Sequence, residues 1–220
     1  MIHIPASFRI GLKLLFLPAL LGLVLSLAPA TARAQARTLT GEELKIVSSV
    51  TEYLNSFLNM EGYFVQTGPS GRYTSGRFFL SRPGRVRFEY EPPSPLMIVA
   101  DGTWVSIENR KLKTSEHYPL SATPLKIILA KNIDLLKDAD ITNAYQDENF
   151  VTLTLHTKGS SDAGQITLVF QASDMTLKEW IVIDGQGLQT RISVSDLVTG
   201  IKQNPKLFFI KKPDFPEPEN

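Results

Sequence analysis

Cysteine is absent from the 220-residue sequence. The chain therefore cannot form a disulfide, present a thiolate nucleophile or carry a lipid through a thioether bond. Its stability must come from an ordinary apolar core, and 43% of its residues are hydrophobic. The absence of thiolates also removes the sulfur ligands of common zinc sites, and we expect neither a metal ion nor another cofactor.

Histidine is scarce as well, which bears on catalysis. Of the three histidines, we interpret His117 as a solvated loop residue and His156 as an outward-facing strand residue. The sequence has no Gly-x-Ser-x-Gly motif, and Gly185-Gln186-Gly187 lacks the rest of a dinucleotide-binding fingerprint. A Ser–His–Asp triad can assemble from residues far apart in sequence, so a secreted lipid or ester hydrolase remains an alternative. We expect a binding protein that is not an enzyme.

Long apolar runs are also missing, except near the N-terminus. There, Arg9 and Lys13 precede an apolar stretch over residues 14–27, and small-x-small patterns follow up to Ala34. This order is typical of a secretory signal peptide, which we assign to residues 1–34. A membrane anchor is the alternative, but the stretch is shorter than the roughly 20 residues that span a bilayer.

Neither sign of charge dominates the rest of the chain. Three of the 23 basic residues and none of the 22 acidic residues lie in residues 1–34, which leaves a net charge of −2 on residues 35–220. This balance is not that of a protein that binds nucleic acid or anionic membranes. The length of residues 35–220 suits one domain.

The first element after the signal peptide is predicted to be a helix. Thr40-Gly41-Glu42-Glu43 has the form of a capping box, in which Thr40 and Glu43 satisfy each other's free backbone donors. Apolar residues then recur at steps of three and four, which is typical of a helix with one buried stripe. These residues are Leu44, Val47, Val50, Leu54 and Phe57.

From residue 62 onward the apolar period changes to two, which is typical of strands. Arg82-Pro83-Gly84 separates two alternating runs, and this predicts an antiparallel hairpin. A register slip of one residue would bury charged side chains, so the alternation assigns the faces. We expect Phe78, Leu80, Val86, Phe88 and Tyr90 to face the core and Arg85, Arg87 and Glu89 to face outward.

Further strands follow, with one helical interruption. Asp101-Gly102 predicts a tight turn, after which Trp104 competes with Val105 and Ile107 for the inner face. Thr123-Pro124 predicts the start of a short apolar helix over residues 124–130. Residues 207–210 are predicted to form a final strand, and residues 211–220 an irregular tail. The whole pattern indicates an antiparallel sheet with one wet face and one face covered by a helix.

Five stretches of the sequence, taken in order, resemble one known family. They are residues 57–66, 76–90, 91–102, 123–132 and 204–209, of which residues 76–90 are the most recognisable. Together they resemble LolA, the family of outer-membrane lipoprotein carriers of Gram-negative bacteria. The family's outer-membrane receptor has a similar fold but is lipid-anchored, which the absence of cysteine disfavours.

This resemblance implies a mainly β fold with an α lid over residues 35–220. The expected architecture is an incomplete antiparallel β-barrel, or half-barrel, with helices covering an apolar cavity. The resemblance also implies a monomeric periplasmic carrier of triacylated lipoproteins. Such a carrier takes its cargo from an inner-membrane ABC-type transporter and passes it to an outer-membrane acceptor. A carrier or sensor for another lipid, such as a glycolipid or a sterol-like molecule, is the alternative within the same fold.

Individual site residues follow from the resemblance together with the alternation. In the family, the arginine of an Arg-Pro pair holds the lid shut by bonding to lid backbone, and Arg82 occupies that position. The alternative is a strand-end arginine before a turn proline. Residues 211–220 have no counterpart that we can match. We expect the lipid-binding cavity to be lined by Phe78, Leu80, Val86, Phe88, Tyr90, Leu96, Ile98, Trp104, Leu125, Ile128, Leu129, Leu168 and Phe170.

Overall fold

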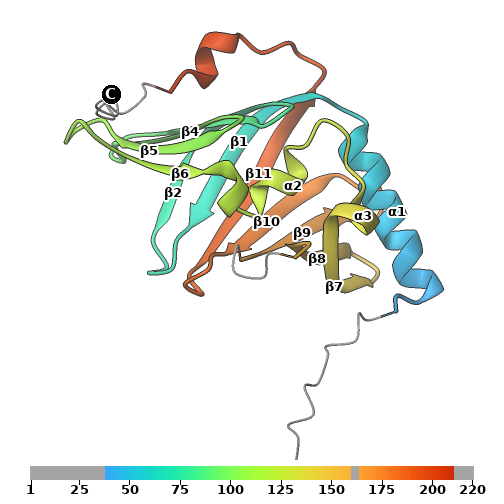
Figure 1. Cartoon of the computed structure of the whole chain (residues 1–220). Coiled ribbons are helices and arrows are strands. Elements are labelled where there is room, and N and C mark those ends of the chain that lie inside the picture. The colour runs from blue at the N-terminus through green and yellow to red at the C-terminus, as the bar shows by residue number, and fades with distance from the viewer. Residues whose placement is uncertain (1–37, 160–163, 211–220) are drawn as a thin grey trace, which may run out of the picture. The chain divides into compact units, whose positions relative to one another are not determined.

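The computed structural model describes residues 38–159 and 164–210, and these form a curved antiparallel sheet with short helices inside its curve (Figure 1). The predicted signal peptide and the predicted irregular tail lie outside the described residues. No helix in the described part of the chain is long and apolar enough to cross a membrane.

The described strands form one eleven-stranded sheet in the order β6-β5-β4-β3-β2-β1-β11-β10-β9-β8-β7. The strands are β1 (Asn59–Thr67), β2 (Tyr73–Ser81), β3 (Arg85–Tyr90), β4 (Leu96–Asp101), β5 (Trp104–Asn109), β6 (Thr114–Pro119), β7 (Ala139–Gln146), β8 (Phe150–Thr157), β9 (Gln165–Gln171), β10 (Leu177–Ile183) and β11 (Gln189–Thr199). The first and last strands pair with each other at the centre of the sheet. The edge strands β6 and β7 are consecutive in the chain, and the sheet is not closed into a barrel.

The helices lie before β1, in the connection between the two edge strands, and after β11. They are α1 (Gly41–Asn55), η1 (Leu120–Ala122), α2 (Leu125–Ile128), α3 (Leu135–Asp138) and η3 (Pro205–Phe208). Figure 1 shows α2 and α3 within the curve of the sheet and α1 beside α3. The predicted mainly β architecture, an incomplete antiparallel barrel with helices, is therefore confirmed.

Helix α1 begins with the predicted capping box. The Glu43 N–H donates to Thr40 Oγ1 over 3.2 Å, and the Thr40 N–H donates to Glu43 Oε2 over 2.8 Å. The buried stripe differs from the prediction at one place, because Leu44 is 42% exposed and Ile46 is buried instead. Both residues are apolar, so the sequence alone did not decide which of them turns toward the sheet.

The predicted hairpin is confirmed as β2 paired with β3 across Arg82-Pro83-Gly84. The predicted faces are confirmed as well: the five apolar side chains belong to the main core inside the curve, while the three charged ones are half-buried on the other face. Close aromatic contacts fill this part of the core. The ring centroid of Phe64 lies 5.2 Å from that of Phe88 and 5.0 Å from that of Tyr90.

A second, smaller apolar cluster on the outer face of β2, β4 and β5 was not predicted. This outer cluster consists of Val99, Phe208 and Ile210, with Phe79, Met97, Trp104 and Leu207 packed around them. Because Val105 pairs with Ala100, which faces the main core, the neighbouring Trp104 must face outward. The expectation that Trp104 lines the inner cavity is therefore wrong.

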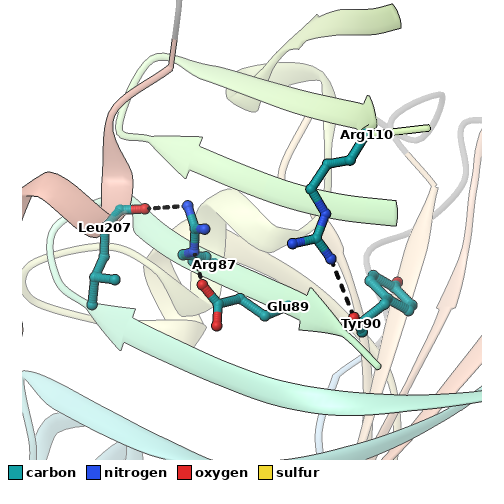
Figure 2. A network of polar contacts seen from close by, with 5 residues as sticks. All are labelled: Arg87, Glu89, Tyr90, Arg110 and Leu207. Carbon is teal, nitrogen blue, oxygen red and sulfur yellow. Dashed lines mark hydrogen bonds and ion pairs between the residues drawn. The ribbon is translucent and has the colours of Figure 1, made fainter. Parts of the chain in front are cut away.

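The prediction of a final strand over residues 207–210 is also wrong. Residues 207 and 208 belong to η3, which begins at Pro205, and residues 209 and 210 follow it outside any strand. The N-cap of η3 is Asn204, whose side chain accepts from the Lys206 N–H. Arg87 fastens this segment to β3, because its Nη1 donates to Leu207 O over 3.0 Å while its Nε donates to Glu89 Oε1 over 2.7 Å (Figure 2). Polar contacts thus hold η3 against the outer face of the sheet.

Three smaller expectations are compared with the structure. Helix α2 has Pro124 at its N-cap with no side-chain cap, because the Thr123 hydroxyl donates instead to Leu120 O over 2.9 Å. His117 lies on the edge strand β6 and its Nε2 is buried without a hydrogen-bond partner. His156 is half-buried, with Nδ1 at 3.1 Å from Gly164 O.

Candidate functional site

An apolar cavity lies between the concave face of the sheet and the helices that cover it. Its volume is about 30 Å³, far below the roughly 300–1,000 Å³ of typical small-molecule pockets. Side chains from β1, β2, β3, β9, β10, α1 and α2 therefore fill most of the interior in this closed form. The lining residues are Leu54, Phe57, Met60, Phe78, Leu80, Arg82, Val86, Phe88, Leu125, Ile128, Leu129, Leu168, Leu177 and Trp180.

Most of the residues predicted for the cavity are brought together here. Eight of the thirteen are in its wall: Phe78, Leu80, Val86, Phe88, Leu125, Ile128, Leu129 and Leu168. Four others, Tyr90, Leu96, Ile98 and Phe170, belong to or pack against the same core but are not part of the wall. Trp104 alone lies on the opposite face.

Several lining residues were missed as cavity residues, and the sequence holds a signal for some of them. Leu54 and Phe57 belong to the predicted buried stripe of the first helix. Their burial was therefore predicted, but not their place in the cavity wall. Trp180 follows the charged Glu179 on β10, which points to an inward Trp180 by alternation. Alternation does not predict the position of Leu177, because the pairing of β10 with β9 shifts register between Leu177 and Glu179.

Arg82 is the one charged residue in the wall, and it is only 5% exposed. Its Nε donates to Ile128 O over 2.8 Å, and its Nη1 donates to Phe57 O over 3.1 Å and also to Leu54 O. Arg82 therefore connects the end of β2 to the C-terminal ends of both α1 and α2. Nearby, the Gly84 N–H donates to Leu129 O over 2.7 Å and adds a backbone contact between the hairpin turn and α2.

The charge of Arg82 is compensated by carbonyl dipoles. No carboxylate in the described residues forms an ion pair with it. Burial lowers the pKa of Arg82 to about 10, and the neighbouring Tyr53 acts weakly in the opposite direction. The guanidinium is still charged at neutral pH, and it lies 4.7 Å from the centroid of the Phe57 ring.

A second set of hydrogen bonds joins α1 to the connection between α2 and α3. The Asn55 Nδ2 donates to Ile133 O over 2.8 Å, and its Oδ1 accepts from the Ile133 N–H over 3.0 Å. The α1 C-terminus, α2 and the segment leading to α3 are thus linked by side-chain bonds to backbone groups. We call residues 124–138, which include α2 and α3, the lid segment.

Other parts of the structure offer less to a ligand. A wider groove of about 760 Å³ lies between α1 and the β7–β8 hairpin, and acidic side chains, among them Glu42, Asp147 and Glu148, surround it. Within residues 38–159 and 164–210, no group of three or more His, Asp or Glu side chains is placed to hold a metal ion. The enclosed apolar cavity is therefore the best candidate for a functional site.

Comparisons with known proteins agree with this architecture. A family model described as outer membrane lipoprotein carrier protein LolA matches residues 55–211. An outer-membrane lipoprotein carrier protein of Neisseria meningitidis serogroup B is 28% identical over 193 residues, which cover 84% of this chain and 86% of the relative. The corresponding protein of Dechloromonas aromatica is 25% identical over 171 residues, 73% of this chain and 79% of the relative.

Solved structures give fold-level likeness only. A LolA superfamily protein from Nitrosomonas europaea superposes with a TM-score of 0.44 and 9% identity, covering 78% of this chain and 99% of that one. The family assignment rests instead on the family model, which spans well over half of the 220 residues. The chain belongs to the LolA family of outer-membrane lipoprotein carrier proteins.

Proposed function

We propose that this protein is a periplasmic carrier that holds the acyl chains of lipoproteins in the cavity beneath the lid segment. The observation that carries the proposal is an apolar interior closed by a buried arginine that bonds only to backbone carbonyls. Relatives named as outer-membrane lipoprotein carriers over most of the chain support the same cargo. The protein would bind and release without a chemical step.

The energetics of the cargo explain why such a cavity is needed. A triacylated lipoprotein carries on the order of 40 methylene groups, and each contributes about 0.8 kcal/mol to membrane binding. Unassisted passage through water is therefore too slow to be useful. A carrier must offer apolar surface in its place, and it must hide that surface when it is empty.

The closed cavity is too small for acyl chains, so loading must displace the lid segment. The Arg82 bond to Ile128 O and the Gly84 N–H bond to Leu129 O oppose this displacement, and a hydrogen bond to a charged group contributes roughly 1.5–3 kcal/mol. That resistance is smaller than the gain from burying several acyl chains. It is also large enough to favour closing again once the cargo has left.

The proposed route follows from the family and from residues 1–34. The predicted signal peptide would direct the protein to the periplasm. There an inner-membrane ABC-type transporter would load it with triacylated lipoproteins, and an outer-membrane acceptor would receive them. We expect it to act as a monomer.

Lipoprotein-loaded inner-membrane vesicles provide the test. Wild-type protein should release lipoprotein into the soluble fraction as a stable complex. Leu129→Glu, which places a carboxylate in the cavity wall, should bind much less, because desolvating that charge is costly. Leu136→Glu makes the same change at a position that is 51% exposed on α3 and should behave as wild type.

Each alternative function predicts a different result. If the folded wild-type protein releases no lipoprotein, the proposal fails. Mass spectrometry of the native protein would then identify a co-purifying glycolipid or sterol-like ligand. Turnover in a broad esterase screen would instead support the hydrolase alternative.

A further inference from the structure

The indole nitrogen of Trp180 is an unused hydrogen-bond donor in the cavity wall. Trp180 is 5% exposed and lines the cavity. Its Nε1 is shielded from solvent and has no hydrogen-bond partner in the described structure. Buried tryptophan N–H groups usually have a partner, so this exception calls for a physical reason.

Packing alone does not require an indole at this position. The Trp180 ring meets Phe78 edge-on, at 5.8 Å between centroids and an interplanar angle of 90°, and it lies 6.1 Å from Phe88. Phenylalanine could make such contacts without burying a donor. An N–H group against an aromatic ring gains only a weak interaction, so the donor remains poorly satisfied in the empty protein.

The rest of the wall offers little competition for this donor. Apart from Arg82 and Trp180, every lining side chain is apolar. Two of the three carbonyls that accept from Arg82, Leu54 O and Phe57 O, lie outside the lid segment, so Arg82 keeps these partners when the lid segment moves. A ligand that brings a hydrogen-bond acceptor into the cavity can therefore use the Trp180 N–H at no cost to the fold.

We infer that the Trp180 Nε1–H donates a hydrogen bond to an ester or amide carbonyl of the bound acyl lipid. This inference rests on the proposed function. The methylene part of an acyl chain has no acceptor, and the carbonyl that links it to its head group is the acceptor nearest to it. Trp180 would thus set how deeply the chains enter and would favour acyl chains over alkyl chains of equal length.

A pair of matched lipids tests the hydrogen bond directly. The probes are 1,2-dipalmitoylglycerol, which has two ester carbonyls, and 1,2-dihexadecylglycerol, in which ether CH₂ groups replace them. Wild-type protein should bind the ester about fivefold more tightly, as expected for one neutral hydrogen bond. Trp180→Phe should lose this preference while its affinity for the ether stays within twofold of wild type.

Spectroscopy gives a readout that does not depend on the Trp180→Phe variant folding. The chain has two tryptophans, and Trp104 lies in the outer cluster, so Trp104→Phe leaves Trp180 as the only indole. In a ¹H–¹⁵N correlation spectrum of that variant, the ester should shift the single indole proton downfield relative to the ether.

The outcomes separate the two proposals. If neither lipid binds the wild-type protein, the acyl-carrier function fails and the inference fails with it. If both lipids bind with equal affinity and give the same indole shift, the carrier function stands and the hydrogen bond is refuted. An ester preference that persists in Trp180→Phe also overturns the inference.

Discussion

At the scale of single residues, Arg82 is the most informative side chain. A buried cation is costly unless its donors are satisfied, and here backbone carbonyls take that role. The Leu54 carbonyl belongs to the last turn of α1, where the helix dipole concentrates partial negative charge. The guanidinium therefore stabilises a helix end that would otherwise leave unpaired acceptors in an apolar environment.

We predict that Arg82→Leu weakens closure of the lid segment and interrupts cargo transfer. The substitution removes three hydrogen bonds and leaves buried carbonyls unpaired. Loaded protein should accumulate, because an open, lipid-filled form loses its drive to close again. The measurement is a two-step assay of release from inner-membrane vesicles followed by delivery to outer-membrane acceptors.

The control for this assay is Arg77→Leu, which changes an arginine on β2, the strand that ends just before Arg82. Arg77 is half exposed and pairs with Glu61 over 3.6 Å on the outer face. It should release and deliver cargo as wild type does. Normal delivery by Arg82→Leu would show that Arg82 is a turn residue and not a latch.

Tyr90 gives a second residue-scale prediction, which concerns pH. Burial raises the pKa of Tyr90 to about 12, partly offset by its hydrogen bond to Gln66. The folded-state pKa lies above the unfolded value of about 10. The neutral Tyr90 side chain therefore contributes its full share to the free energy of unfolding below pH 10, and this share is lost as the pH rises toward 12. Two pKa units correspond to about 2–3 kcal/mol.

Urea unfolding of wild type and Tyr90→Phe between pH 9 and pH 12 measures this contribution. The stability of wild type relative to the variant should fall by up to that amount across the range. The lowered pKa of Arg82 affects wild type and variant alike, so its effect on stability cancels in the difference. A difference that does not change with pH would contradict the prediction.

At the scale of elements, alternation and capping predicted what the chain does locally, and packing decided the rest. The capping box followed from the spacing of Thr40 and Glu43. The β2–β3 hairpin followed because charged and apolar residues alternate strictly in β3 after the turn at Pro83-Gly84. In β5 apolar side chains occur on both faces of the strand, so alternation alone could not assign Val105 to the inner face. Its pairing with Ala100 decides this. The apolar residues after Pro205 do not repeat with a helical or a strand period, so the sequence did not predict their structure. They fold as η3, and the side chains of Leu207 and Phe208 pack in the outer cluster.

The outer cluster should contribute strongly to stability through Phe208. This ring is 3% exposed and lies 5.6 Å from the Arg85 guanidinium, whereas the adjacent Phe209 is 74% exposed. Phe208→Ala should therefore lower the free energy of unfolding by about 3–5 kcal/mol. Phe209→Ala should change it by no more than about 0.5 kcal/mol. Equal effects in chemical denaturation would mean that η3 does not hold to the sheet as described.

At the scale of the whole molecule, the chain topology couples the sheet to its cover. The two edge strands β6 and β7 are joined by the connection that contains the lid segment. Arg82, Gly84 and Asn55 fasten that connection to β2, to the hairpin turn and to α1. We propose that opening breaks these few bonds and the apolar contacts of the lid segment while the strand ladders stay intact.

Hydrogen exchange can test this division between a movable cover and a fixed sheet. Because the closed cavity holds only about 30 Å³, we expect the binding of 1,2-dipalmitoylglycerol to move the lid segment away from the sheet. Amides of residues 125–138 should then exchange faster in the loaded protein, since exchange reports local opening. Amides of β9 and β10 should be unchanged or better protected, because their ladder stays paired.

Two variants make the exchange experiment decisive. Arg82→Leu should show fast exchange in residues 125–138 even without lipid, because its cover is already loosened. Leu129→Glu should show no lipid-dependent change, because it does not bind. If lipid instead slows exchange across the lid segment in the wild-type protein, the acyl chains enter without displacing it. The volume for cargo would then have to come from separation of the two halves of the sheet at the β1–β11 pairing.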